Sequence, residues 1–263
     1  MAHALTDAGF GAFPRVRKID TADLQSALAK GLDDFLAMPS HAIFLSIIYP
    51  IVGLIVVQAA LGGALMPLIF PIVAGFALVG PFAGIGLYEL SRRRERGLDC
   101  TASHVVVDVF QSPAIGAVAV LGLSLMVVFL VWLVVAQRLY LALFGSAAPE
   151  SLASFLHDLA VTPAGHMLII VGNGVGFLFA LLVLTMSVVS FPLLLDRQVG
   201  LVTAVTTSCR AVAANPAAMA LWGLIVAGAL VLGSAPLLFG LAVVMPVLGH
   251  ATWHLYRAVV VVD

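Results

Sequence analysis

Two histidines near the end of the chain have the spacing of a ligand pair. His250 and His254 are four residues apart, so a helix would place both side chains on one face. Such imidazoles can bind a metal ion or the edge of a haem, and His41 is expected at a similar depth in the membrane. No cysteine or carboxylate completes a ligand set at that depth. We favour the alternative, an interfacial belt with Trp253 and Tyr256, and expect no metal and no cofactor.

An amide within a glycine-rich run is a second candidate. Asn173 lies in the sequence Gly172-Asn173-Gly174-Val175-Gly176, inside a strongly apolar stretch. Glycines let two helices approach closely, and an amide in hydrocarbon bonds to a neighbouring helix, so the pattern favours helix packing. The alternative is contact with a substrate or an ion, because polar groups inside membrane helices often mark pathways.

Charged and sulfur-containing side chains cluster between two apolar stretches. The arginines of this cluster fix the cytoplasmic side of the protein and could also hold anionic lipid headgroups; they are Arg92, Arg93, Arg94 and Arg96. A zinc site would need Cys100 and His104 together with the distant Cys209 and a fourth ligand such as Asp108. Both cysteines fall in segments that we place on the cytoplasmic side, so we expect reduced thiols. We expect no zinc, because the ligands would meet only if the two distant segments pair in the fold.

Composition requires lipid as the solvent for much of this chain. Of its 263 residues, 62% are hydrophobic and only 10% are charged, whereas a soluble domain has about 25% charged residues. The net charge of −1 gives no basic balance that would favour nucleic acid as a partner. We therefore predict an all-α membrane protein in contact with the bilayer.

Six stretches are apolar enough to cross a bilayer as helices, given that a span needs about 20 residues. The last apolar run is divided at Gly233-Ser234-Ala235-Pro236, because proline interrupts the helical hydrogen bonds. The predicted spans are 41–61, 65–87, 114–136, 167–189, 218–232 and 237–256. They form one transmembrane domain, 41–263, after a cytoplasmic segment, 1–40. With the N-terminus inside, eleven of the twelve Lys and Arg residues fall on the cytoplasmic side, and Arg138 is the exception. Both termini are then cytoplasmic.

Three amphipathic helices are expected between or before the spans, at 21–37, 98–112 and 150–160. Each has apolar side chains on one stripe, so each lies in the membrane interface or packs on the spans. A weak parallel repeat is also predicted. Arg94, Gly97 and Pro113 recur at an offset of 103 residues as Arg197, Gly200 and Pro216.

Several strings of residues resemble a family of proteobacterial predicted integral membrane proteins with no established activity. They are Val16-Arg17-Lys18-Ile19, Pro39-Ser40-His41 and the runs 86–95, 172–176, 190–197 and 246–257. The resemblance covers nearly the whole chain and implies a bacterial inner membrane. Some members of the family are labelled putative cytochrome c oxidase subunit I. That activity needs two haems and a copper held by several histidines, and only three of the seven histidines here lie near membrane depth.

The leading functional prediction is therefore a non-catalytic scaffold, assembly or accessory protein, with other membrane proteins or respiratory complexes as partners. The alternative is a small transporter or channel, against which the absence of charge in mid-span counts. An enzyme is not favoured, because the sequence has no P-loop, dinucleotide fingerprint, zinc-protease motif or nucleophile elbow.

Overall fold

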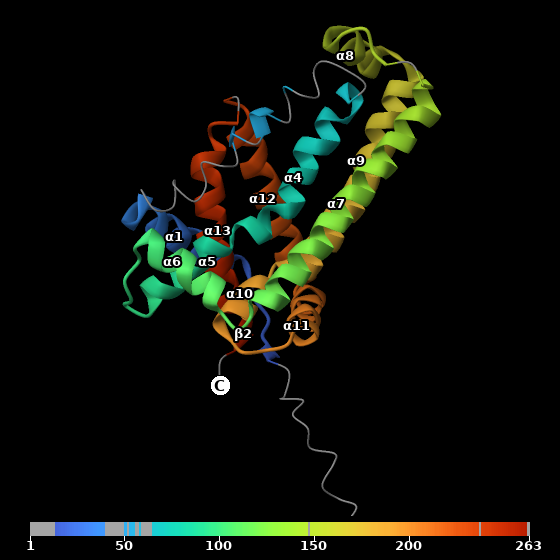
Figure 1. The fold of residues 1–263 in the computed structure, drawn as a ribbon. Helices are drawn as coiled ribbons and strands as arrows, with labels where there is room; N and C mark the ends of the chain where they lie inside the picture. Colours follow the sequence, from blue (N-terminus) through green and yellow to red (C-terminus); the bar gives the residue numbers. More distant parts are fainter. Residues whose placement is uncertain are drawn as a thin grey trace, which may run out of the picture.

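The computed structural model describes residues 14–39, 50, 51, 53–55, 58, 65–146, 148–236 and 238–261. It shows an elongated helical protein with long helices running between two ends (Figure 1). The predicted first span, 41–61, falls largely outside the described residues, and so does His41.

Three of the long helices are long and apolar enough to cross a membrane. They are α7 (Ile115–Phe144), α9 (Pro163–Ser187) with its continuation α10 (Ser190–Asp196), and α12 (Pro216–Ser234). Even the 19 residues of α12 extend about 28 Å at 1.5 Å per residue. Large apolar side chains such as Leu123, Ile170 and Leu224 are exposed on them, which suits contact with lipid.

Two further helical segments correspond to the predicted second and sixth spans. The 3-10 turn η1 (Met66–Leu68) leads into α4 (Ile69–Ala83), and after a break at Gly84 the chain continues as α5 (Ile85–Glu95). The last helix is α13 (Leu241–Val259). The predicted break before it is confirmed, because α12 ends at Ser234. Because only three of the described helices satisfy the length and composition of a span, the six predicted spans are not established. The predicted repeat also stays a prediction.

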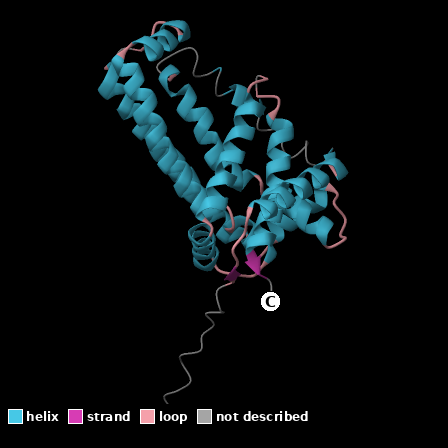
Figure 2. Cartoon of the chain, turned by 180° about the vertical axis from the view of Figure 1, so that it is seen from behind, coloured by secondary structure: helices cyan, strands magenta, loops and turns pink. Residues whose placement is uncertain are grey.

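Shorter helices lie at the two ends of the long ones. At one end are α1 (Thr21–Ala37), α6 (Ala102–Gln111) and α11 (Leu201–Ala214), and at the other end is α8 (Leu152–Val161) (Figures 1 and 2). The three predicted amphipathic segments are all helical. We call the end that holds α1, α6, α10 and α11 the polar end.

Helix α1 packs along α13 instead of standing apart from the other helices. It begins at a capping box, in which the Asp20 side chain accepts from the backbone of Asp23 and the Asp23 side chain accepts from the backbone of Asp20. Its middle touches α13 directly. A Cβ atom added to Gly31 would lie 2.5 Å from the backbone nitrogen of Ala251. Of the two placements expected for this helix, packing on the helical bundle is the one observed.

The two ends of the described chain meet at the polar end. Strand β1 (Arg15–Val16) pairs antiparallel with strand β2 (Val260–Val261). The buried side chain of Asn215 fastens the same region, because its oxygen accepts from the backbone N–H of Ile19 at 2.8 Å and its amide donates to the carbonyl of Arg17 at 3.0 Å. The chain before α1 is thereby held to the start of α12.

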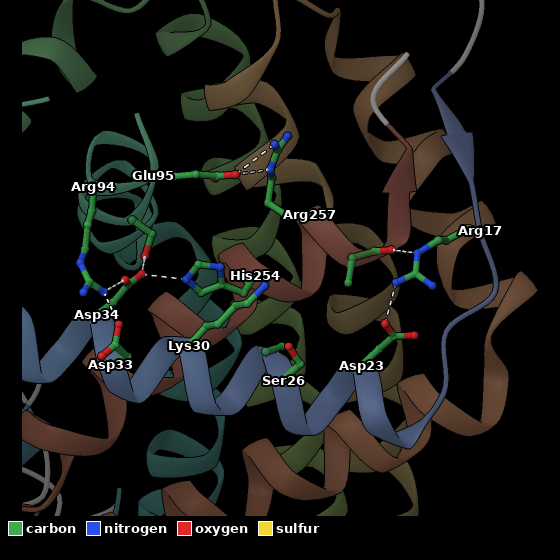
Figure 3. Close-up of a pocket in the computed structure, with 13 residues that line it drawn as sticks. Arg17, Asp23, Ser26, Lys30, Asp33, Asp34, Arg94, Glu95, His254 and Arg257 are labelled. Carbon is green, nitrogen blue, oxygen red and sulfur yellow. Dashed lines mark hydrogen bonds and ion pairs between the residues drawn. The ribbon is translucent and has the colours of Figure 1, made fainter. Parts of the chain in front are cut away.

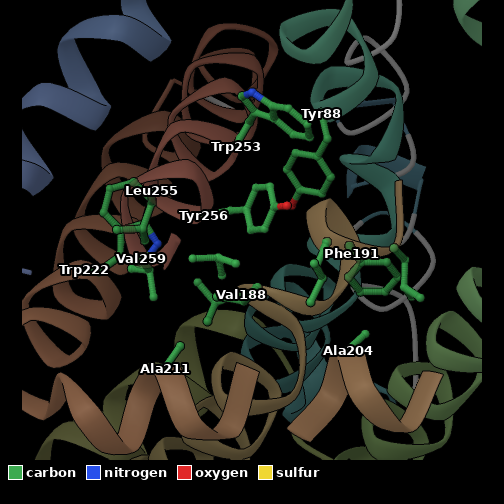
Figure 4. Close-up of a cluster of buried hydrophobic side chains, with 14 of the residues drawn as sticks. Tyr88, Val188, Phe191, Ala204, Ala211, Trp222, Trp253, Leu255, Tyr256 and Val259 are labelled. Atoms are coloured by element: carbon green, nitrogen blue, oxygen red, sulfur yellow. The ribbon is translucent and has the colours of Figure 1, made fainter. Parts of the chain in front are cut away.

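The main apolar core lies where α5, α10, α11, α12 and α13 converge, as Figure 4 shows. Its largest fully buried side chains are aromatic, with Trp222, Trp253, Tyr256 and Phe191 among them. Tyr256 and Trp253 were expected in an interfacial belt, but both are at most 1% exposed. The side chains of Trp253 and Tyr256 are therefore covered by other parts of the protein.

Candidate functional site

A buried carboxylate joins three helices at the polar end. Asp34 on α1 accepts a hydrogen bond from Ser91 Oγ on α5 at 2.6 Å and one from His254 Nε2 on α13 at 2.8 Å, both through Oδ2. Its other oxygen is paired with Arg94. The side chain of Asp34 is only 5% exposed. We call Asp34, Ser91, Arg94, His250 and His254 the Asp34 network.

His250 enters this network through Ser91. Its Nδ1 lies 2.8 Å from Ser91 Oγ. Because the Ser91 hydroxyl donates its proton to Asp34, its oxygen is left to accept from Nδ1–H of His250. The other ring nitrogen of His250, Nε2, is buried. The histidine pair thus shares one helix face as predicted, but its members have different neighbours.

Hydrogen bonds to Asp34 favour its ionised form. Burial by itself would raise the pKa of this carboxyl group. The hydrogen bonds from His254, Ser91 and Arg94 outweigh burial and hold the pKa at about 2, below the ordinary 3.8. Asp34 therefore carries a full negative charge at neutral pH and binds α5 and α13 to α1.

A second buried carboxylate lies beside the first network. Asp196, at the end of α10, accepts from Arg96 at 2.7 Å and from the hydroxyl of Tyr256 at 2.7 Å, and its side chain is 5% exposed. Arg257 lies 3.5 Å from the same carboxylate and forms an ion pair with Glu95 at 3.0 Å. Together with the Asp34 network, these contacts tie α1, α5, α10 and α13 to one another.

All four arginines predicted as lipid-headgroup candidates have a carboxylate partner. Arg92 pairs with Glu89 through two contacts of 2.6 Å, and Arg93 pairs with Asp108. Arg94 pairs with Asp34, and Arg96 pairs with Asp196. Because the guanidinium groups already have partners, lipid binding by this cluster would have to compete with ion pairs. It stays a prediction.

The other candidates from the sequence are not brought together. Asn173 is exposed, and its amide donates to the carbonyl of Ile169 in its own helix at 2.7 Å, so it bonds to no other described helix. His104 pairs with Asp99, whereas Asp108 is held by Arg93. Within the described residues, no group of three or more His, Cys, Asp or Glu side chains could hold a metal ion.

Several residues at the centre of the site were not identified from the sequence. Asp34 and Ser91 were not singled out at all, and Asp196 was assigned only a local pairing near arginines. Asn215 was likewise missed. A usable signal existed for Asp34. The carboxylates of Asp33 and Asp34 interrupt the apolar stripe of the predicted helix 21–37, where one acidic side chain must face the buried side.

One pocket lies beside the Asp34 network, along the face of α1 that is turned toward α13 (Figure 3). Its volume is about 590 Å³. Ser26 and Lys30 line it from α1, Arg94 and Glu95 from α5, and His254 from α13. A pocket of this size can hold a small molecule.

The comparison with protein families identifies part of the chain. Residues 69–196 match the model of a family described as predicted integral membrane protein (DUF2189). The match runs from α4 to α10, so it includes Ser91, the arginine cluster and Asp196 but leaves out α1 and α13. No curated protein and no solved structure matches the chain. Residues 69–196, slightly less than half of the chain, are thus similar to this family of predicted integral membrane proteins.

Proposed function

We propose that this chain is a non-catalytic membrane protein that serves as a scaffold, assembly or accessory protein for other membrane proteins, with respiratory complexes as one class of partner. The observation that carries the proposal is the set of ion pairs at the polar end. Ion pairs join α5 to α1, to α10 and to α13, and such a network makes this end rigid. A fixed surface joined to apolar helices suits a protein that positions others.

We further propose six spans in a bacterial inner membrane with both termini in the cytoplasm. The pairing of β1 with β2 supports an even number of crossings, because both strands lie at the same end. Among the described residues, three helices satisfy the length and composition of a span, which is an odd number, and we therefore propose α13 as a further crossing that returns the chain to the polar end. Near the N-terminus, Met38 lies at the polar end of the molecule, whereas Leu68 packs against Trp132, beyond the middle of α7. This difference in position along the long helices supports a crossing between the two residues.

The orientation can be tested by labelling cysteines in intact cells. In a background with Cys100 and Cys209 replaced by serine, we expect a membrane-impermeant thiol reagent to label Glu150→Cys before α8. It should not label Gln198→Cys between α10 and α11 until the membrane is permeabilised. Both positions are exposed in the structure. Labelling of position 198 and protection of position 150 in intact cells would reverse the proposed orientation.

The scaffold function predicts a stoichiometric partner. Purification of the tagged full chain in a mild detergent should recover one or more membrane proteins in a fixed ratio, measured by mass spectrometry, and an unrelated multi-pass protein with the same tag serves as the control. An absorption spectrum of the same sample reports any haem. Recovery of the chain alone, or a Soret band lost in His250→Ala, would contradict the proposal.

A small transporter is the second candidate, and one observation favours it. Gln137 Oε1 on α7 is buried with no hydrogen-bond partner among the described residues, and an unsatisfied polar atom in a span often marks a pathway. Asn173 gives this alternative little support, because it faces outward and bonds to its own helix. Uptake of a solute by proteoliposomes that contain only this chain would favour the transporter.

A further inference from the structure

Most carboxylate oxygens that line the pocket at the polar end already accept hydrogen bonds. Three of its carboxylates, Asp23, Asp34 and Glu95, accept hydrogen bonds with both oxygens. The fourth, Asp33, is bound to Arg94 at 2.8 Å, and its side chain is 71% exposed. A cationic ligand would therefore compete with existing hydrogen bonds and ion pairs for most of these oxygens.

The pocket has hydrogen-bond donors that are not in use. Lys30 lies exposed on α1, and none of the described residues forms an ion pair or a hydrogen bond with its ammonium group. Ser26 is one turn earlier on the same face of α1, and its hydroxyl has no partner among them either. Figure 3 shows Lys30 reaching across the pocket toward His254, between the ion pairs of Arg94 and Arg17.

One of the cations around the pocket is available to an anionic ligand. The four carboxylates are matched by four cations, Arg17, Lys30, Arg94 and Arg257. Each of the three arginines is bound to a carboxylate, so Lys30 is the cation that a ligand could engage without breaking an ion pair. A tetrahedral anion has acceptor oxygens for an ammonium group and a hydroxyl group at once.

We propose that this pocket binds a phosphate group, which Lys30 and Ser26 hold by donating hydrogen bonds. The phosphate belongs to a lipid headgroup or to a small phosphorylated molecule from the surrounding water, since both offer the same anionic oxygens. This inference does not depend on the scaffold function, because it concerns the occupant of one pocket.

The test uses the purified full chain in detergent and two probes. Binding of inorganic phosphate is measured by isothermal titration calorimetry, and binding of phosphatidylglycerol is measured by native mass spectrometry with phosphatidylcholine as the zwitterionic comparison. Lys30→Gln removes the free cation, and Lys18→Gln is the matched control, because Lys18 is exposed and lies outside the pocket. Thermal unfolding of each variant checks that it is folded.

We expect Lys30→Gln to weaken binding by about tenfold, as for the loss of one charge-assisted hydrogen bond, with Lys18→Gln close to the wild type. Ser26→Ala should weaken binding less. If Lys30→Gln weakens only the binding of phosphatidylglycerol, the occupant is a lipid headgroup. If it weakens only the binding of inorganic phosphate, the occupant is a small phosphorylated molecule, and weaker binding of both probes supports a phosphate site that accepts either. The proposal is overturned if neither probe binds, or if Lys18→Gln and Lys30→Gln weaken binding equally.

Discussion

Replacement of Asp34 by asparagine is expected to lower the free energy of unfolding by about 3 kcal/mol, in the range measured when one partner of a buried ion pair is removed. The carboxylate is 5% exposed and accepts from Ser91, His254 and Arg94. Asparagine has nearly the same shape, but it removes the negative charge and one acceptor. The Arg94 guanidinium then loses its buried counter-charge, and α1 loses its main polar contact with α5 and α13.

Asp33→Asn is the matched control for this prediction. Asp33 is adjacent in sequence and pairs with the same arginine at 2.8 Å, but its side chain is 71% exposed. An exposed ion pair contributes about 0–1 kcal/mol, so this variant should unfold almost like the wild type. Unfolding of the detergent-solubilised chain can be followed by tryptophan fluorescence, because Trp222 and Trp253 are buried in the core. Equal losses in the two variants would contradict a special role for Asp34.

The stability of the wild-type protein should depend on acid more strongly than that of Asp34→Asn. The folded pKa of Asp34 is about 2, below the ordinary 3.8. For a carboxyl group with a lowered pKa, the stabilisation is present above the unfolded value and is lost as the pH falls through the folded value. The wild-type protein should therefore lose stability between about pH 4 and pH 2, and Asp34→Asn should show a smaller loss over that range.

The sequence predicted the helices well because their signals are local. The amphipathic stripe, which follows a capping Asp20 or Thr21 and precedes Pro39, predicted a helix at 21–37, and the structure has the helix at the same residues. The break in the last apolar run was also predicted correctly from Pro236. The second span was less accurate. The apolar stretch 65–87 contains a break at Gly84 that divides α4 from α5, and hydropathy alone does not detect such a break.

The candidate site could be predicted only in part, because its contacts join residues far apart in the chain. The i,i+4 spacing of His250 and His254 correctly placed the two side chains on one face. Their partners could not be found in this way, since Asp34 is more than 200 residues from either histidine in the sequence. Ser91 has no local feature that distinguishes it from an ordinary serine at the end of a helix.

Asn173 shows the opposite case, a strong local pattern without a long-range contact. An amide among three glycines favours close helix packing, and Gly176 does lie against Trp132 on α7. The amide itself is on the exposed side of α9 and is satisfied by the carbonyl of Ile169. Which face of a helix meets its neighbour depends on rotation about the helix axis, and spacing between like residues does not determine that rotation.

Substitution of Gly31 should destabilise the protein because it separates α1 from α13. An added Cβ would lie 2.5 Å from the backbone nitrogen and 2.7 Å from the Cα of Ala251. Backbone atoms cannot move aside as a flexible side chain can, so the two helices have to shift. We expect Gly31→Ala to lower the free energy of unfolding by about 2 kcal/mol, within the range for overpacked cores, and Gly31→Val to lower it further.

Gly228→Ala on α12 is the control, because nothing lies within 4 Å of the added Cβ. Alanine in place of glycine inside a helix is favourable by about 1 kcal/mol, so this variant should be as stable as the wild type or slightly more so. Hydrogen exchange measured by mass spectrometry adds a local readout. In Gly31→Val the amides of α1 should exchange faster, whereas those of α7 should change little. Unchanged exchange in α1 together with wild-type stability would show that α1 does not pack on α13 through Gly31.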